Sequence, residues 1–96
     1  MNRKLDTEAV ARLMQSVLSL KTADEAYKFF EDVCTVNEIL TIAQRHEVAY
    51  LLRKGCTYLD IAEKTGASTA TISRVNRSLS SGGEGYEITF GRIEES

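Results

Sequence analysis

The sequence predicts an all-α protein, and three observations lead to that fold class. Apolar residues recur at helical spacing along most of the 96 residues, and the chain contains no proline that would break a helix. Ser and Thr residues stand where helices need N-caps. The stretch 57–79, TYLDIAEKTGASTATISRVNRSL, has the pattern of two short helices joined by a glycine. We therefore expect a helical domain organised around a helix-turn-helix.

The first helix is expected over about residues 6–20, after a short basic start, with Asp6 or Thr7 as its cap. Its apolar residues form one stripe at i, i+3, i+4, i+7 and i+8: Val10, Leu13, Met14, Val17 and Leu18. A chain of this length has little mass with which to cover that stripe. We therefore expect this helix to pack on a second copy of the chain.

Two capping boxes mark the next two helix starts. Thr22 with Glu25 begins a helix that runs to about Val33, and Thr35 with Glu38 begins another directly afterwards. This third helix is expected over residues 36–54, ending at Gly55, with apolar residues on more than one face, as in a central helix contacted from two sides.

The helix-turn-helix has a steric reason at each of its main positions. Thr57 and Ser68 can cap its two helices, and Gly66 can take the left-handed conformation that ends the first one. Small Ala62 suits a close helix crossing. The residues expected to face inward are Leu59, Ile61 and Ala62, then Ala70 or Thr71, Ile72, Val75 and Leu79. A generic helical hairpin is the competing interpretation, but it does not require all these residues at fixed offsets.

The net charge of −2 conceals an uneven distribution. Residues 1–40 carry five basic and seven acidic side chains, residues 41–79 carry six and three, and residues 80–96 carry one and four. The basic charge is concentrated around the helix-turn-helix, as phosphate contact requires. Arg53, Lys54 and Lys64 are therefore candidate phosphate contacts, although a solvated rim explains each of them equally well.

Other functional classes receive little support. Cys34 and Cys56 form no CxxC pattern and His46 is the single histidine, so no metal site of usual spacing and no catalytic constellation is expected. Each cysteine precedes a capping Thr and is read as a small apolar group in a reducing compartment. We expect no cofactor, no enzymatic activity and no membrane segment, and hence a cytoplasmic protein.

The last segment is expected to stand apart from the rest, which gives a helix-turn-helix domain at 1–81 and a Gly-rich break with an acidic tail at 82–96. Tyr86, Ile88 and Phe90 alternate with polar residues, as in a strand, but no second strand is available to pair with it. One interpretation is a mobile tail that docks loosely. The other is an acidic tail that covers the basic face or contacts a partner.

The segments LLRKGCTYLDIAEKTG and GASTATISRVNRSL, together with the helix order, resemble the Trp repressor family and most of all its YerC/YecD-type branch. The resemblance covers about residues 6–79. It implies a Trp-repressor-like helical fold, an intertwined homodimer and two helix-turn-helix heads that enter successive major grooves of double-stranded DNA. Such a protein is a sequence-specific transcriptional regulator, most often a repressor.

The resemblance and the basic pattern together give a set of DNA-binding candidates. The base-facing positions fall on Thr69, Ala70 and Ser73, which can use hydroxyl, methyl and water-mediated contacts but supply no bidentate reader. Arg74 and Arg77 form a basic edge suited to phosphate. The complete set is Thr57, Tyr58, Lys64, Ser68, Thr69, Ala70, Ser73, Arg74 and Arg77.

The resemblance also implies a small-molecule site at Gln44, Arg45 and Arg74. Arg74 matches an arginine that flanks the corepressor tryptophan, but its partner arginine falls on Gln44. A glycine of the family pocket is replaced by Val75, and a threonine by Cys34. These departures argue against tryptophan as the ligand.

Two hypotheses follow from the sequence. The first is the homodimeric DNA-binding regulator. The second is a protein-interaction module that keeps the fold without specific DNA binding, which the net negative charge favours.

Overall fold

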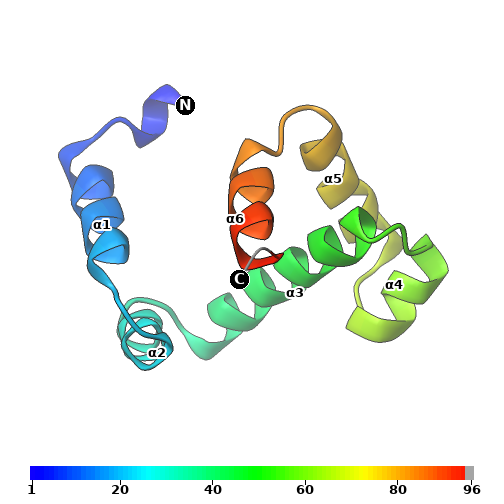
Figure 1. The fold of residues 1–96 in the computed structure, drawn as a ribbon, viewed down its shortest axis with the longest axis horizontal. Helices are drawn as coiled ribbons and strands as arrows, with labels where there is room; N and C mark the ends of the chain where they lie inside the picture. Colours follow the sequence, from blue (N-terminus) through cyan, green and yellow to red (C-terminus); the bar gives the residue numbers. More distant parts are fainter. Residues whose placement is uncertain (95–96) are drawn as a thin grey trace. The chain divides into compact units, whose positions relative to one another are not determined.

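The computed structural model describes residues 1–94, and within them all regular structure is helical (Figure 1). This confirms the all-α prediction. The elements in chain order are η1 (Arg3–Leu5), α1 (Glu8–Ser19), α2 (Ala23–Val33), α3 (Val36–Arg53), α4 (Tyr58–Thr65), α5 (Thr69–Ser80) and α6 (Glu84–Glu94).

The chain divides into two compact units, Met1–Ile39 and Leu40–Ser96. In the first unit, the predicted threonines cap both helices. The N–H of Val10 donates to Thr7 Oγ1 at 3.1 Å, and the N–H of Glu25 donates to Thr22 Oγ1 at 3.1 Å. These bonds satisfy N–H groups that have no partner inside the helix, and so they fix where α1 and α2 begin.

Neither α1 nor α2 contains a buried residue. Apolar side chains remain exposed on both helices, among them Leu18 at 84% and Tyr27 at 71%. Phe29 and Phe30 contact each other edge to face, with ring centroids 5.4 Å apart. The apolar stripe predicted for the first helix is therefore present and largely uncovered within this chain.

The second unit contains the hydrophobic core, which draws residues from α3, α4, α5, α6 and the turn between α4 and α5. Its buried members are Val48, Ala49, Ile61, Ala67, Ile72, Val75 and Phe90. Partly buried side chains pack around them, including Leu51, Leu52 and Cys56. Helix α3 supplies Val48 and Ala49 to this core, and it contacts α4 through Gln44 and α6 through His46 and Tyr50.

Helix α3 starts and ends at the predicted signals. The N–H of Glu38 donates to Thr35 Oγ1 at 3.1 Å, and the N–H of Thr35 donates to Glu38 Oε1 at 2.8 Å, which completes the capping box. The backbone hydrogen bond from Thr35 and then its side-chain bond lower the pKa of Glu38. At the other end Gly55 has φ of +84°, which suits a glycine after a helix.

The alternation of Tyr86, Ile88 and Phe90 has the period of a strand, but these residues form part of helix α6. Tyr86 and Phe90 are four positions apart, a spacing that satisfies both a strand period and a helix period. In the helix they share one face, where their rings stack at 5.6 Å, whereas Ile88 is 51% exposed.

The expectation of a loosely docked tail is also wrong for the described part of this segment. Phe90 is fully buried against α3, with ring centroids 5.0 Å from His46 and 5.7 Å from Tyr50. Helix α6 accordingly lies beside α3 in Figure 1. The turn that brings it back contains Gly83 at φ of +73°.

Candidate helix-turn-helix and the adjoining hollow

The two helices of the motif begin and end as predicted. The N–H of Asp60 donates to Thr57 Oγ1 at 3.2 Å, which caps α4, and the N–H of Thr71 donates to Ser68 Oγ at 3.1 Å, which caps α5. Gly66 ends α4 at φ of +72°, in the left-handed region, and its N–H donates to the carbonyl of Ala62 at 2.9 Å.

The turn between α4 and α5 is braced by residues that sequence reasoning missed. Thr65 Oγ1 donates to the carbonyl of Ile61 at 2.7 Å and accepts from the N–H of Ala67 at 3.1 Å. Ala67 is 5% exposed and belongs to the core. The sequence did contain a signal for this brace, a Thr directly before the glycine that ends α4. A hydroxyl at that position can hydrogen-bond backbone N–H and C=O groups that have no partner inside the helix.

The inner face of the motif is largely as expected. Ile61 and Ile72 are fully buried, and Val75 is 5% exposed. Of the two alternatives at the start of the second helix, Thr71 is half-buried and Ala70 is exposed, so Thr71 faces inward. Leu59 was expected to face inward but is 81% exposed. It is two positions from Ile61, which places the two side chains on opposite sides of a helix.

The predicted DNA-binding residues lie on the surface of α4, α5 and their caps. Thr57 is the N-cap of α4, Tyr58 is its first residue at 37% exposed, and Lys64 lies in its last turn. Ser68 is the N-cap of α5. The remaining members lie along α5, all exposed except half-buried Ser73: Thr69, Ala70, Ser73, Arg74 and Arg77.

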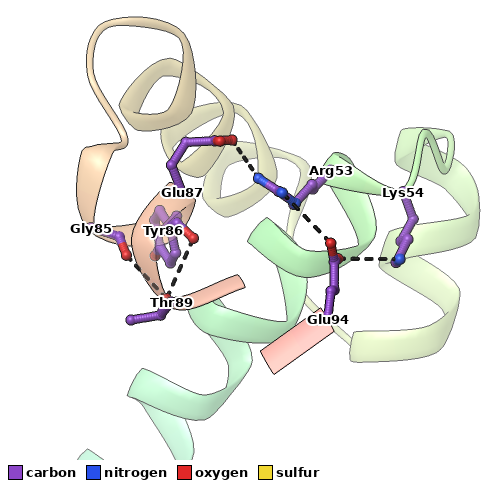
Figure 2. Close-up of polar contacts among 7 residues, drawn as sticks. All are labelled: Arg53, Lys54, Gly85, Tyr86, Glu87, Thr89 and Glu94. Atoms are coloured by element: carbon purple, nitrogen blue, oxygen red, sulfur yellow. Dashed lines mark hydrogen bonds and ion pairs between the residues drawn. The ribbon is translucent and has the colours of Figure 1, made fainter. Parts of the chain in front are cut away.

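The cations near the motif fall into two groups. Among residues 1–94, no ion pair involves Lys64, Arg74 or Arg77. Arg53 and Lys54, at the end of α3, instead form ion pairs with carboxylates of α6 (Figure 2). The basic side chains of the motif itself are thus available to an external anion, whereas the two at the end of α3 are already engaged.

The three residues predicted to line a small-molecule site do lie around one hollow, of about 340 Å³. Gln44 and Arg45 come from α3 and Arg74 comes from α5. The remaining lining residues are Thr41, Thr71, Val75, Ser78 and Tyr86. This volume is at the lower end of the range of about 300–1,000 Å³ that is usual for ligand pockets.

Two features of the hollow bear on what it could hold. The side-chain amide of Gln44 donates to the carbonyl of Thr65 at 3.2 Å, so it is engaged in holding α4. Tyr86 of α6 also lines the hollow, a contribution that sequence reasoning missed because it assigned that segment to a tail.

Other site classes find no support in the described part of the chain. No group of three or more His, Cys, Asp or Glu residues there could hold a metal ion. No helix in residues 1–94 combines the length and apolar character needed to cross a membrane. Both cysteines are free and half-buried, and Cys56 packs against the core.

The fold and the site define a helix-turn-helix protein of the all-α class. The family model for the Trp repressor protein matches residues 8–94. YerC of Bacillus subtilis, a curated relative described as uncharacterized, is 52% identical over 92 residues, which cover 96% of this chain and 88% of YerC. The chain belongs to the Trp repressor family.

Two crystal structures carry the same fold over nearly the whole chain. A TrpR-like protein from Eubacterium eligens is 67% identical with a TM-score of 0.93, over 97% of this chain and 96% of that one. A Staphylococcus aureus protein provisionally assigned as a Trp repressor is 44% identical with a TM-score of 0.92, over 98% and 95% of the two chains. The resemblance stated from the sequence, including the likeness to YerC, is confirmed.

Proposed function

We propose that this protein is a homodimeric, sequence-specific DNA-binding transcriptional regulator of the cytoplasm, acting as a repressor through the helix-turn-helix at 57–79. The observation that carries the proposal is that the outer face of α5 is accessible to solvent and bears basic side chains. This face is exposed and polar, and Arg74 and Arg77 have no ion pair within residues 1–94. Membership of the Trp repressor family supports the same function.

Each part of the motif has a role in the proposed complex. The exposed side chains of Thr69 and Ala70, with half-buried Ser73, face base edges in the major groove and read them by hydroxyl, methyl and water-mediated contacts. Arg74 and Arg77 contact phosphates and fix the register of α5. At the start of α4, Thr57 and Tyr58 place backbone N–H groups where a helix N-terminus can hold a phosphate.

The dimer is supported by the uncovered apolar surface of the first unit. Helices α1 and α2 bury no residue, and Leu18 and Tyr27 remain mostly exposed. Two copies would bring two motifs to half-sites about one helical turn apart. Sedimentation analysis at micromolar concentration tests this arrangement, and a monomer there would rule out a two-headed mechanism.

Tryptophan is not favoured as an effector. The hollow lined by Arg45 and Arg74 is also lined by Val75, at the position where the family pocket has a glycine. Gln44 replaces a second arginine of the family pocket, and its amide is bonded to Thr65. We propose that regulation by this protein is independent of tryptophan.

The experiment that tests the function is selection of genomic DNA fragments by the purified protein at near-physiological salt, with and without L-tryptophan. Recovery of one recurring inverted repeat, unchanged by tryptophan, is the expected result. Enrichment that requires tryptophan would contradict the proposal about the effector. Binding without any sequence preference would contradict the proposal of a specific regulator.

A protein-interaction module is the second candidate, favoured by the net charge of −2 and by the lack of a bidentate base reader among Thr69, Ala70 and Ser73. The salt dependence of binding to random duplex separates the two candidates. Phosphate contacts give a steep loss of affinity with rising salt, whereas an interaction module gives a slope near zero.

A further inference from the structure

Two basic side chains at the end of α3 are held by two carboxylates of α6 (Figure 2). The guanidinium of Arg53 is hydrogen-bonded to Glu87 through Nη1 and lies 3.6 Å from Glu94 Oε2 through Nη2. Lys54 Nζ lies 3.2 Å from Glu94 Oε1. Glu87 and Glu94 are separated by about two helical turns, so one face of α6 carries both acids.

The packing of α6 keeps these carboxylates in place. Phe90 lies between them in sequence and is fully buried, and the guanidinium of Arg53 lies 5.8 Å from the centre of its ring. The hydrogen bond from Lys54 is the main cause that lowers the pKa of Glu94, so the ion pair favours the charged form of this carboxylate. The acids thus meet the bases because a buried aromatic residue fixes the helix that carries them.

The engaged cations adjoin the proposed DNA-binding surface. Lys54 is followed by Gly55 and Cys56 and then by Thr57, the N-cap of α4. Three residues span at most about 10 Å, so a phosphate held at the start of α4 is within reach of a lysine side chain at this position. Arg53 and Lys54 are therefore placed to extend the contacts of the motif along the DNA backbone.

We propose that α6 is an intramolecular acidic competitor that occupies Arg53 and Lys54 in place of DNA phosphates and so holds down the affinity for DNA. This inference rests on the proposed function. Ion pairs this close to solvent are weak and screened by salt, so phosphates can exchange with the carboxylates. Any event that withdraws Glu87 and Glu94 raises the affinity without changing the recognition helix.

The test is fluorescence anisotropy of the full chain with random-sequence duplex, over a series of salt concentrations. The double variant Glu87→Gln and Glu94→Gln is expected to bind about three- to tenfold more tightly than the wild type, because two cations become available to phosphate. Its affinity should also fall more steeply with salt, since more phosphates are neutralised in the complex.

A matched control separates this effect from a general change in charge. Glu84→Gln alters the net charge in the same helix, where no ion pair of Glu84 occurs within residues 1–94. It should give a smaller gain than either Glu87→Gln or Glu94→Gln. When Arg53→Gln and Lys54→Gln are added to the double variant, its gain in DNA affinity should disappear. Circular dichroism checks that each variant keeps α6 folded.

The outcomes separate the two proposals. If the wild type binds DNA and Glu84→Gln raises the affinity as much as Glu87→Gln or Glu94→Gln does, the competitor role is overturned. The same holds if the double variant keeps its higher affinity after Arg53 and Lys54 are replaced. In both cases the DNA-binding function still stands. Absence of DNA binding by the wild type and every variant, even at low salt, would overturn the proposed function and this inference with it.

Discussion

The side-chain amide of Gln44 donates a hydrogen bond of 3.2 Å to the backbone carbonyl of Thr65, which joins the middle of α3 to the last turn of α4. A carbonyl at that place has no partner inside its own helix. Gln44 therefore acts as a brace for the turn of the helix-turn-helix, although it also lines the hollow beside Arg74.

Removing this brace should weaken the fold measurably. Gln44→Leu is expected to lower the free energy of unfolding by about 1 kcal/mol, because a part-buried hydrogen bond is lost while the volume is nearly kept. Urea denaturation measures the change. Glu47→Leu, at an exposed position of α3, is the control and should stay within about 0.5 kcal/mol. Equal effects of the two changes would contradict the bracing role.

The aromatic contact between α6 and α3 predicts a large stability effect at one position. Phe90→Ala is expected to lower the free energy of unfolding by about 3–5 kcal/mol, since a fully buried ring is removed and a cavity remains. Ile88→Ala, on the exposed side of the same helix, should cost less than about 1 kcal/mol. Thermal melting compares the two, and similar losses would show that α6 is not docked as described.

Two glycines in different settings predict opposite signs on substitution, Gly66 in the turn of the motif and Gly91 inside α6. Gly66→Ala should destabilise the protein by about 1–2 kcal/mol, because φ of +72° strains any residue with a Cβ even though no atom lies within 4 Å. Gly91→Ala should stabilise it by about 0.5–1 kcal/mol, since alanine favours a helix and the space is open. Denaturant midpoints for both variants provide the check.

The capping box at the start of α3 predicts a pH dependence. The hydrogen bonds from Thr35 lower the pKa of Glu38 below its ordinary value of 4.5. A lowered carboxyl pKa gives stability that is present above the ordinary value and is lost as pH falls through the lowered one. The wild type should therefore lose more stability on acidification than Glu38→Gln. Urea midpoints measured from neutral pH to about 3 test this, and parallel curves would contradict it.

The recognition helix predicts two distinguishable effects on DNA binding. Arg77→Ala should weaken binding to all sequences alike and reduce the salt slope by about one, because it removes a phosphate contact. Thr69→Ala should change the order of preference among sequences with little effect on the slope, because it removes a contact to a base edge. Anisotropy titrations of a small set of duplexes measure both. If Arg77→Ala changed the preference among sequences instead, Arg77 would contact a base edge and not a phosphate, contrary to the proposal.

Most of the fold was predictable because its signals are local. Thr7, Thr22, Thr35, Thr57 and Ser68 each hydrogen-bond the N–H three residues ahead, an interaction that depends on a handful of neighbouring residues. The grouping of Gln44, Arg45 and Arg74 around one hollow came from the family resemblance, because no local pattern joins α3 to α5.

The segment after Gly82 could not be assigned correctly from a local pattern. Its helix is weakly marked, with Gly85 and Gly91 inside it, and its spacing of apolar residues fits two periods. What decides the outcome is the long-range packing of Phe90 on His46 and Tyr50. The pairing of Arg53 with Glu87, 34 positions later, depends on the same docking and has no signature in sequence.

The docking of α6 also has a consequence for the order in which this unit assembles. Helices α4 and α5 adjoin in sequence, so their mutual packing closes only a short loop, whereas the contact of Phe90 with Tyr50 closes a loop that contains the whole motif. Longer loops cost more entropy to close and form more slowly. We therefore expect α4 and α5 to pack on α3 first. Helix α6 should be the last element to join the unit and the first to detach from it.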